Sequence, residues 1–275
     1  MYTAEISRLN PSAFLFVIDQ SGSMSEMMAT EQTKAQFVAD VLNKTLYQLI
    51  IRCTRSDGVR NYFDVGVIAY GNTVQSGLAG ALNGKILFSL SDIEANPLRI
   101  EERIKRVPDG AGGLVEQKTK FPVWFDPTSS GNTPMRAAMA FGAEVVTEWC
   151  DAHPTSYPLT IIHVTDGVST DGDPSEIADA MKKLSTGDGE CLLFNLHIST
   201  AEGQPVVFPS SENSLDTYGR LLFHMSSLFP EHLVPIARER GYTSVDSTSR
   251  FFGYKAGYEA IVDFFDIGTR PSNLR

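Results

Sequence analysis

The hydrophobic positions of this chain alternate between two patterns. Short apolar runs of strand length are separated by longer stretches in which apolar residues recur at helical spacing. Apolar runs without a polar face are typical of parallel strands that are covered on both sides. The pattern predicts strands over Phe14–Ile18, Phe63–Tyr70, Lys85–Leu90, Leu159–Asp166, Cys191–Ile198 and Phe251–Tyr254.

Between these runs, the helical period predicts the helices. One begins at Asp173-Pro174-Ser175-Glu176, which combines a capping side chain, a proline at the first helical position and a glutamate three residues after the cap. The full set is Glu31–Ile51, Thr133–Cys150, 174–185, two helices within 215–240, and Tyr258–Phe265. Strands that alternate with helices in this way predict an α/β fold, a doubly wound and mostly parallel sheet of Rossmann-like type with helices on both faces.

Length and composition favour one domain over residues 1–275. A chain of 275 residues with 42% hydrophobic residues can bury a large core without disulfides or structural metals. Four prolines and the glycine cluster Gly110–Gly113 interrupt residues 96–127, so we expect an insertion or lid without long elements there, with a flexible loop at the glycines. Residues 199–250 form an elaborated segment with a polar beginning.

Charge and cysteine content limit the partners and the compartment. The net charge of −10 would repel nucleic acid and anionic membranes, so we expect neither as a partner. Cys53, Cys150 and Cys191 form no C-x-x-C pair and are expected to be reduced. The sequence shows no signal-peptide pattern, and its first apolar run is too short to cross a bilayer. Both features favour a cytoplasmic location.

The polar residues at two strand ends are the main candidates for chemistry. Asp19, Ser21 and Ser23 follow the first strand as Asp-x-Ser-x-Ser, and Asp166 ends the Leu159 strand. Thr133 lies in a turn before a long helix. Parallel strands place such ends in one crevice, where hydroxyl and carboxylate oxygens suit Mg²⁺ or Mn²⁺. The alternative is that these side chains only supply hydrogen bonds within turns.

At these residues the sequence resembles the von Willebrand factor A family, over nearly the whole chain from Ala13 to Arg270. The resemblance implies a metal-ion-dependent adhesion site in which hydroxyls bind Mg²⁺ directly, with Mn²⁺ or Ca²⁺ as other candidates. It further implies that carboxylates act through water or position the ligands, and that a partner's Asp or Glu completes the site. The implied direct ligands are Ser21, Ser23 and Thr133, and the implied carboxylates are Asp19 and Asp166.

The element Ser226–Pro230 and the end of the chain resemble bacterial cytosolic single-domain members of that family. Such proteins accompany serine/threonine kinases, metal-dependent phosphatases or AAA+ ATPases in stress, signalling or defence systems. The resemblance therefore implies a scaffold or regulator that binds a protein partner and catalyses no reaction.

The competing hypothesis is a Mg²⁺-dependent phosphatase or phosphotransferase. Related enzymes carry Asp-x-Asp after a strand, but position 21 is serine, so the second carboxylate needed for acid–base chemistry is missing. Ser169 does not fit a hydrolase elbow, and no phosphate-binding loop motif occurs. The five histidines show no metal-ligand spacing and are expected to be structural.

Three further polar residues lie near the predicted site. Asp171 and Asp173 could border the metal, although solvent exposure explains Asp171 and helix capping explains Asp173 better. Asn72 could contact a partner, although a turn role fits its place after the second strand better.

Overall fold

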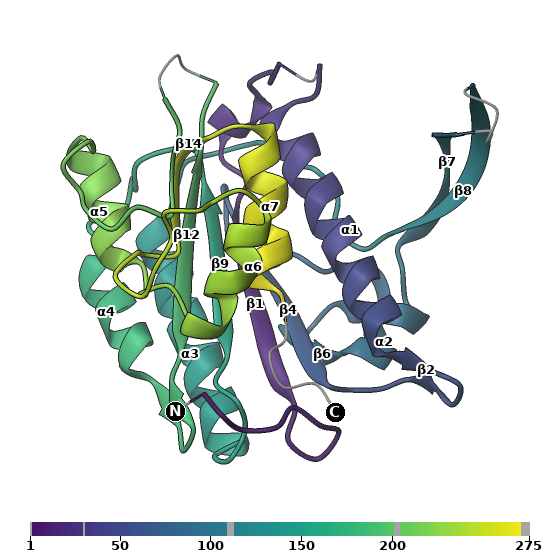
Figure 1. Ribbon diagram of the computed structural model, residues 1–275, viewed down its shortest axis with the longest axis horizontal. Helices are drawn as coiled ribbons and strands as arrows, with labels where there is room; N and C mark the ends of the chain where they lie inside the picture. The colour runs from purple at the N-terminus through teal and green to yellow at the C-terminus, as the bar shows by residue number, and fades with distance from the viewer. Residues whose placement is uncertain (1, 30, 109–112, 201–203, 271–275) are drawn as a thin grey trace.

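The computed structural model describes residues 2–29, 31–108, 113–200 and 204–270, and it shows one sheet enclosed by helices (Figure 1). Eight strands form this sheet in the order β13-β14-β12-β9-β1-β4-β5, and β6 also pairs with β4. The inner strands are parallel, and the edge strands are antiparallel to their neighbours. The bounds are β1 Ser12–Asp19, β4 Phe63–Tyr70, β5 Val74–Ser76, β6 Leu87–Ser89, β9 Thr160–Thr165, β12 Leu192–Ile198, β13 Val206–Val207 and β14 Phe252–Ala256.

β1 is the central strand and all eight of its residues are buried. It lies between β4 and β9, in a register that pairs Asp19 with Tyr70 and Ile18 with Val164. Since the three strands are parallel, their carboxyl ends meet at one edge of the sheet. Asp19 at the end of β1 and Asp166 just after β9 are therefore neighbours, as the sequence predicts.

Alternate side chains of β1 belong to two separate cores. Phe16 packs into the core that contains α1 and α7, whereas Leu15 packs into the core that contains α3, α4 and α5. The helices accordingly cover both faces of the sheet, which confirms the doubly wound α/β fold (Figure 1). The helices are α1 Lys34–Cys53, α2 Leu90–Ala95, α3 Met135–Ala152, α4 Ser175–Lys183, α5 Thr217–Met225, α6 Val234–Glu239 and α7 Tyr258–Gly268.

A long hairpin projects from the body of the molecule (Figure 1). Its strands are β7 (Arg99–Pro108) and β8 (Leu114–Val123), each of ten residues, and they pair only with each other. The expectation that residues 96–127 lack a long element is therefore wrong. Both strands of a two-stranded ribbon are edge strands, so Pro108 and Pro122 are tolerated. Most of the glycine cluster, Gly110–Gly112, lies outside the described residues.

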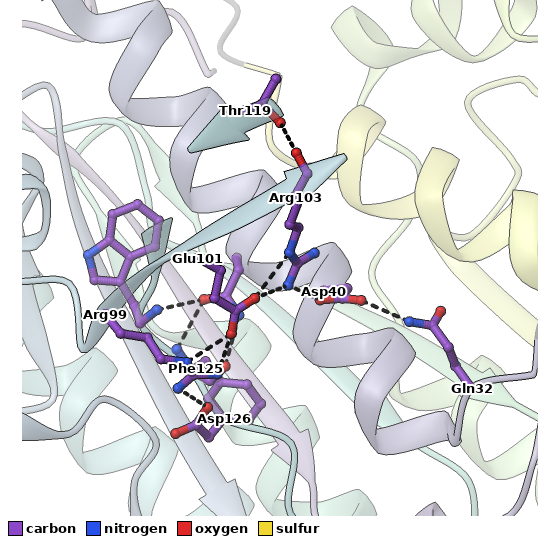
Figure 2. A network of polar contacts seen from close by, with 10 residues as sticks. Gln32, Asp40, Arg99, Glu101, Arg103, Thr119, Phe125 and Asp126 are labelled. Atoms are coloured by element: carbon purple, nitrogen blue, oxygen red, sulfur yellow. Dashed lines mark hydrogen bonds and ion pairs between the residues drawn. The ribbon is translucent and has the colours of Figure 1, made fainter. Parts of the chain in front are cut away.

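A polar network fastens the base of the hairpin to α1 (Figure 2). The Arg103 guanidinium on β7 lies 2.8 Å from Asp40 of α1 and 2.9 Å from Glu101, and it stacks 3.7 Å over the Phe121 ring. Arg99 pairs with Asp126 at 2.6 Å. The base of the hairpin is thereby held to the domain through charge-assisted hydrogen bonds.

The remaining elements are short. They comprise the strand pairs β2 Thr54–Arg55 with β3 Gly58–Val59 and β10 Ser185–Thr186 with β11 Gly189–Glu190, and the 3-10 helices η1 Gly22–Ser25, η2 Gly80–Leu82 and η3 Glu231–Leu233. The two helices expected within 215–240 are α5 and α6. Over the ranges given above, none of the helices has the length and apolarity needed to cross a membrane.

Candidate metal centre

Asp19 anchors two of the loops at the carboxyl edge of the sheet. Its carboxylate is fully buried at the end of β1. One oxygen accepts the Ser21 backbone N–H at 2.8 Å, and the other accepts the Thr165 hydroxyl at 2.8 Å. The side chain thus ties the turn after β1 to the end of β9 and orients the hydroxyls that follow it.

The two serines of the Asp-x-Ser-x-Ser segment point into the same site. The Ser21 and Ser23 Oγ atoms lie 3.2 Å apart, and Ser23 donates its hydroxyl to Asp166 Oδ1 at 2.7 Å. The 3-10 turn η1 begins directly after Ser21 and presents Ser23 to the end of β9. Residues 143 positions apart in sequence are thereby in direct contact.

Thr133 reaches this site from a third loop. A methyl group added to Gly167 would lie 3.9 Å from Thr133 Oγ1 and 4.0 Å from Ser23 Oγ, so both hydroxyls face the same small space beside Gly167. Two hydrogen bonds hold Thr133 to Thr170. The Thr133 backbone N–H donates to Thr170 Oγ1 at 3.1 Å, and the Thr170 backbone N–H donates to the Thr133 carbonyl at 2.9 Å. The structure therefore brings all five predicted site residues together.

Backbone contacts hold the Thr133 loop against the first loop. The Gly22 N–H donates to the Gly131 carbonyl at 3.0 Å, and the Ser130 N–H donates to the Gln20 carbonyl at 2.7 Å. Gly131 has φ of +83°, and a β-carbon there would lie 2.3 Å from Asn72 Oδ1. Only glycine fits such a close approach in this backbone conformation.

The donor set fits a hard divalent cation. Magnesium binds oxygen at short distances with octahedral geometry, which places adjacent ligands about 2.9 Å apart. The separation of 3.2 Å between Ser21 Oγ and Ser23 Oγ is close to that edge length. In the part of the chain that the structure describes, no three His, Cys, Asp or Glu side chains are grouped to hold a metal. A cation here would depend on hydroxyl oxygens.

Burial controls the charge of Asp19. It raises the pKa of this carboxyl to about 6, while hydrogen bonds from Ser21 and Thr165 favour the ionised form and the nearby Asp166 adds to the rise. A buried carboxylate next to a second one is electrostatically costly unless positive charge lies close to them.

Lys34 supplies positive charge at the site, and sequence reasoning missed it. Its side chain is only 5% exposed, and Nζ lies 3.0 Å from Asp166 Oδ2 and 2.6 Å from Glu26 Oε2. Lys34 is the first residue of α1, where the helix dipole disfavours a cation. That unfavourable position is the one signal in the sequence that could have indicated a specific role.

Two other contacts were not predicted. Thr165 bonds Asp19, as described, and Tyr218 donates its hydroxyl to the Gly167 carbonyl. Asp171 is solvent-exposed, as predicted, and it also accepts the backbone N–H groups of Arg136 and Ala137 at 2.9 and 2.8 Å, so it caps α3.

Asp173 and Asn72 make the local contacts expected of turn and cap residues. Asp173 accepts the Ser175 N–H at 2.9 Å at the start of α4. Asn72 donates to the Ser130 hydroxyl at 2.9 Å and so supports the Thr133 loop from the adjacent strand end.

The buried histidines have structural partners. Asn195 uses its amide N–H₂ to bond Ser226, so its oxygen accepts the His163 Nδ1–H at 2.8 Å, and His163 Nε2 accepts the Tyr70 hydroxyl at 2.7 Å. Burial lowers the pKa values of His163 and His197 to about 4. Both rings are therefore neutral near pH 7.

The strand order and the enclosing helices define a doubly wound, Rossmann-like α/β domain. No protein-family model matches the chain, and no curated protein sequence does. Solved structures do match, at low sequence identity.

Three of these structures illustrate the similarity. The vWF domain of the type V pili tip protein Mfa5 from Porphyromonas gingivalis has a TM-score of 0.32 and 12% identity, covering 58% of this chain and 39% of that one. A structure of three N-terminal domains of the same protein has the same TM-score and identity, and the match covers 58% of this chain and 20% of that one. The D319A mutant of the PilB minor pilin from Streptococcus sanguinis has a TM-score of 0.47 and 11% identity, covering 94% of this chain and 61% of that one. This chain therefore spans less than two thirds of each of these three chains.

Proposed function

We propose that this protein is a metal-dependent recognition module that binds a carboxylate of a protein partner. Ser21, Ser23 and Thr133 would hold Mg²⁺ directly, and Asp19 and Asp166 would position these ligands or act through water. The observation that carries the proposal is the convergence of three loops beside Gly167, where hydroxyls from two of them, Ser21 with Ser23 and Thr133, meet the Asp166 carboxylate from the third.

The buried charges explain why a carboxylate would be the preferred ligand. Among the buried groups, Asp19 and Asp166 contribute two negative charges and Lys34 contributes one positive charge, whereas Glu26, which also pairs with Lys34, is 55% exposed and is screened by water. When bound, a divalent cation supplies a net positive charge at this edge that an Asp or Glu of a partner can neutralise. Hydroxyl ligands leave that charge in place because they are neutral.

The contacts of Asp19 disfavour the alternative of a phosphatase or phosphotransferase. Both of its carboxylate oxygens accept hydrogen bonds, and the side chain is fully buried, so neither oxygen is presented to a substrate. Ser21 stands where such an enzyme would need its second carboxylate. Recognition without covalent chemistry is therefore the function we propose.

The finer parts of the proposal come from the family resemblance. We propose a cytoplasmic bacterial scaffold or regulator whose partner is a kinase, a phosphatase or an AAA+ ATPase in a stress, signalling or defence system. The three cysteines are free thiols, which fits a reducing compartment.

Direct metal titration is the first test. Calorimetry with Mg²⁺, and the loss of free Mn²⁺ signal in electron paramagnetic resonance, should show one site in the wild type and none in the Ser21→Ala/Ser23→Ala variant. Thr147→Ala is the matched control, because its hydroxyl only bonds the Ala143 carbonyl within α3. Binding that is equal in all three proteins would refute the site.

Partner capture is the second test. Protein captured from native lysate in Mg²⁺ should be lost both with chelator and with the double-serine variant, while Thr147→Ala retains it. Partners that persist in every arm would show that this edge is not the recognition surface, and phosphatase assays with aryl phosphates would then follow.

A further inference from the structure

Two cysteines from distant parts of the chain lie in contact, away from the candidate metal centre. Cys150 is in the last turn of α3, and Cys191 directly precedes β12. Their Sγ atoms are 3.5 Å apart although the residues are 41 positions apart in sequence. Both side chains are buried in the same core, with 6% and 2% of the residue surfaces exposed.

We propose that Cys150 and Cys191 form a reversible intramolecular disulfide when the protein meets a peroxide. A disulfide sulfur pair is about 2.05 Å apart, so the two sulfur atoms need to approach by about 1.5 Å. Cys150 lies in the last turn of its helix and Cys191 just before its strand, so the adjustment is local to the ends of two elements.

Access comes through a surface hollow beside Cys191. This hollow has a volume of about 860 Å³, and Cys191 lines it together with both basic and acidic side chains, Lys182, Lys183, Arg250, Asp179, Glu190 and Glu231. It is large enough for hydrogen peroxide to reach Cys191, and the Cys150 sulfur lies 3.5 Å from the Cys191 sulfur.

The chemistry needs one equivalent of hydrogen peroxide. The Cys150 thiolate attacks one peroxide oxygen, the O–O bond breaks, and Cys150 becomes a sulfenic acid as hydroxide leaves and takes up the proton that Cys150 had released. The Cys191 sulfur then attacks the sulfenic sulfur, an S–S bond forms, and the S–OH oxygen leaves as water with the Cys191 proton. Two thiols are oxidised, and the peroxide is reduced to two waters.

The order of the two steps follows from the electrostatics of the pair. The hydrogen bond between the two sulfurs lowers the pKa of Cys150, and this same contact, together with burial, raises the pKa of Cys191. We assign the attack to Cys150 and the resolving step to Cys191; because the two sulfurs are in contact, the same disulfide forms if they exchange roles.

Peptide mapping tests the proposal. The folded wild type, reduced and then desalted, is treated with hydrogen peroxide, alkylated in denaturant and digested with trypsin. Cleavage after Lys183 separates Cys150 from Cys191. We expect a cross-linked peptide pair, lighter by two hydrogens than its parts and lost again on reduction with dithiothreitol. Sulfinic or sulfonic acid at one cysteine without this pair would overturn the proposal.

The third cysteine provides the matched control. Cys53 is also fully buried, and burial raises its pKa to about 11. Cys53→Ser should keep the cross-link, whereas Cys150→Ser and Cys191→Ser should each lose it. The cross-link is looked for first in the wild type, so the test of the proposal still stands if a cysteine variant fails to fold.

Thermal unfolding separates a native disulfide from one formed by unfolded chains. We expect the oxidised wild type to unfold cooperatively, with Tm about 5–10 °C above the reduced protein, because the cross-link closes a long loop in the unfolded state. A cross-link that forms only in denaturant, or an oxidised protein without a cooperative transition, would overturn the proposal. None of these readouts involves the metal centre.

Discussion

At the residue scale, the electrostatics of the candidate site depend on how Asp166 is neutralised. Its side chain is fully buried, with one oxygen on the Ser23 hydroxyl and the other on the Lys34 ammonium. A cation bound at the proposed site would therefore compete with Lys34 to neutralise the same carboxylate. This competition would lower the affinity for metal, while the ion pair stabilises the Asp166 carboxylate without it.

We predict that Lys34→Met binds Mg²⁺ more tightly, by about tenfold, because the metal becomes the sole counter-charge of Asp166. Without metal the variant should lose about 3 kcal/mol of unfolding free energy, since a buried carboxylate is left unpaired. Calorimetric titration and urea unfolding with and without Mg²⁺ measure both effects. Lys44→Met, at an exposed position of the same helix, is the control. Weaker binding in a folded Lys34→Met protein would contradict the competition.

We also predict that Gly167→Ala fills the space between the hydroxyls. The added methyl would lie 3.9 Å from Thr133 Oγ1 and 4.0 Å from Ser23 Oγ, so it meets no atom closely enough to strain the fold. Mg²⁺ binding should weaken by at least about tenfold, while Tm changes by less than about 2 °C. Gly257→Ala, with nothing within 4 Å of the added methyl, is the control. Unchanged affinity would place the metal elsewhere.

The sequence could predict which five residues lie together at the candidate site, but not the residues that support them. Asp19, Ser21 and Ser23 belong to one short segment that follows an apolar run, so their relation is local. Lys34 and Asp166 are 132 positions apart, and their contact depends on how α1 packs beside the end of β9. Packing of that kind is set by tertiary structure and leaves little trace in residue spacing.

At the element scale, the strands in the middle of the sheet were the most predictable part of the fold. Phe63–Tyr70 has the same bounds in prediction and structure, because a strand buried on both faces is a continuous apolar run between polar turns. The hairpin β7–β8 was not predicted. Each of its strands pairs only with the other, so no continuous apolar run marks them.

The hairpin also gives an element-scale prediction. Arg103→Met removes the contacts with Asp40 and Glu101 but keeps a stem over Phe121, so the base of β7 should loosen while the core is unaffected. We expect faster cleavage by trypsin within residues 99–123 and a change in Tm below about 2 °C, as partly exposed ion pairs contribute little to global stability.

Lys118→Met serves as the control for this experiment. Lys118 pairs with Glu102, but both side chains are largely exposed, at 76% and 68%. Lys118→Met removes one trypsin site, but the rate of cleavage at the other sites within residues 99–123 should be unchanged. Equal cleavage of wild type and Arg103→Met would show that the network in Figure 2 does not hold the hairpin to α1.

At the scale of the whole molecule, stability depends on neutral histidines buried in the sheet. His163 lies fully buried on β9 between Tyr70 and Asn195, and its ring is satisfied only in the neutral tautomer with the proton on Nδ1. Protonation at Nε2 would place an N–H against the Tyr70 hydroxyl, which must then turn its own proton away. Burial disfavours the charged ring as well, and it lowers the pKa to about 4.

The direction of the pH effect follows from this lowered pKa. An unfolded histidine titrates near about 6.5, so between that pH and about 4 the unfolded chain binds a proton that the folded protein does not. The contribution of His163 to stability is complete above about pH 6.5 and decreases as the pH falls toward 4. His197 acts in the same direction, whereas Asp19, whose pKa is raised to about 6, acts in the opposite one.

A comparison of wild type with His163→Gln isolates the contribution of this one ring. Between pH 7 and pH 5 the wild type should lose about 2 kcal/mol more unfolding free energy than the variant, since the other titrating groups are common to both proteins. Urea unfolding at each pH, followed by circular dichroism, gives the two slopes. The variant will be less stable than wild type at pH 7, and it is the difference in slope that carries the prediction. Parallel pH profiles would mean that the pKa of His163 is the same in the folded and unfolded protein, and would contradict the prediction.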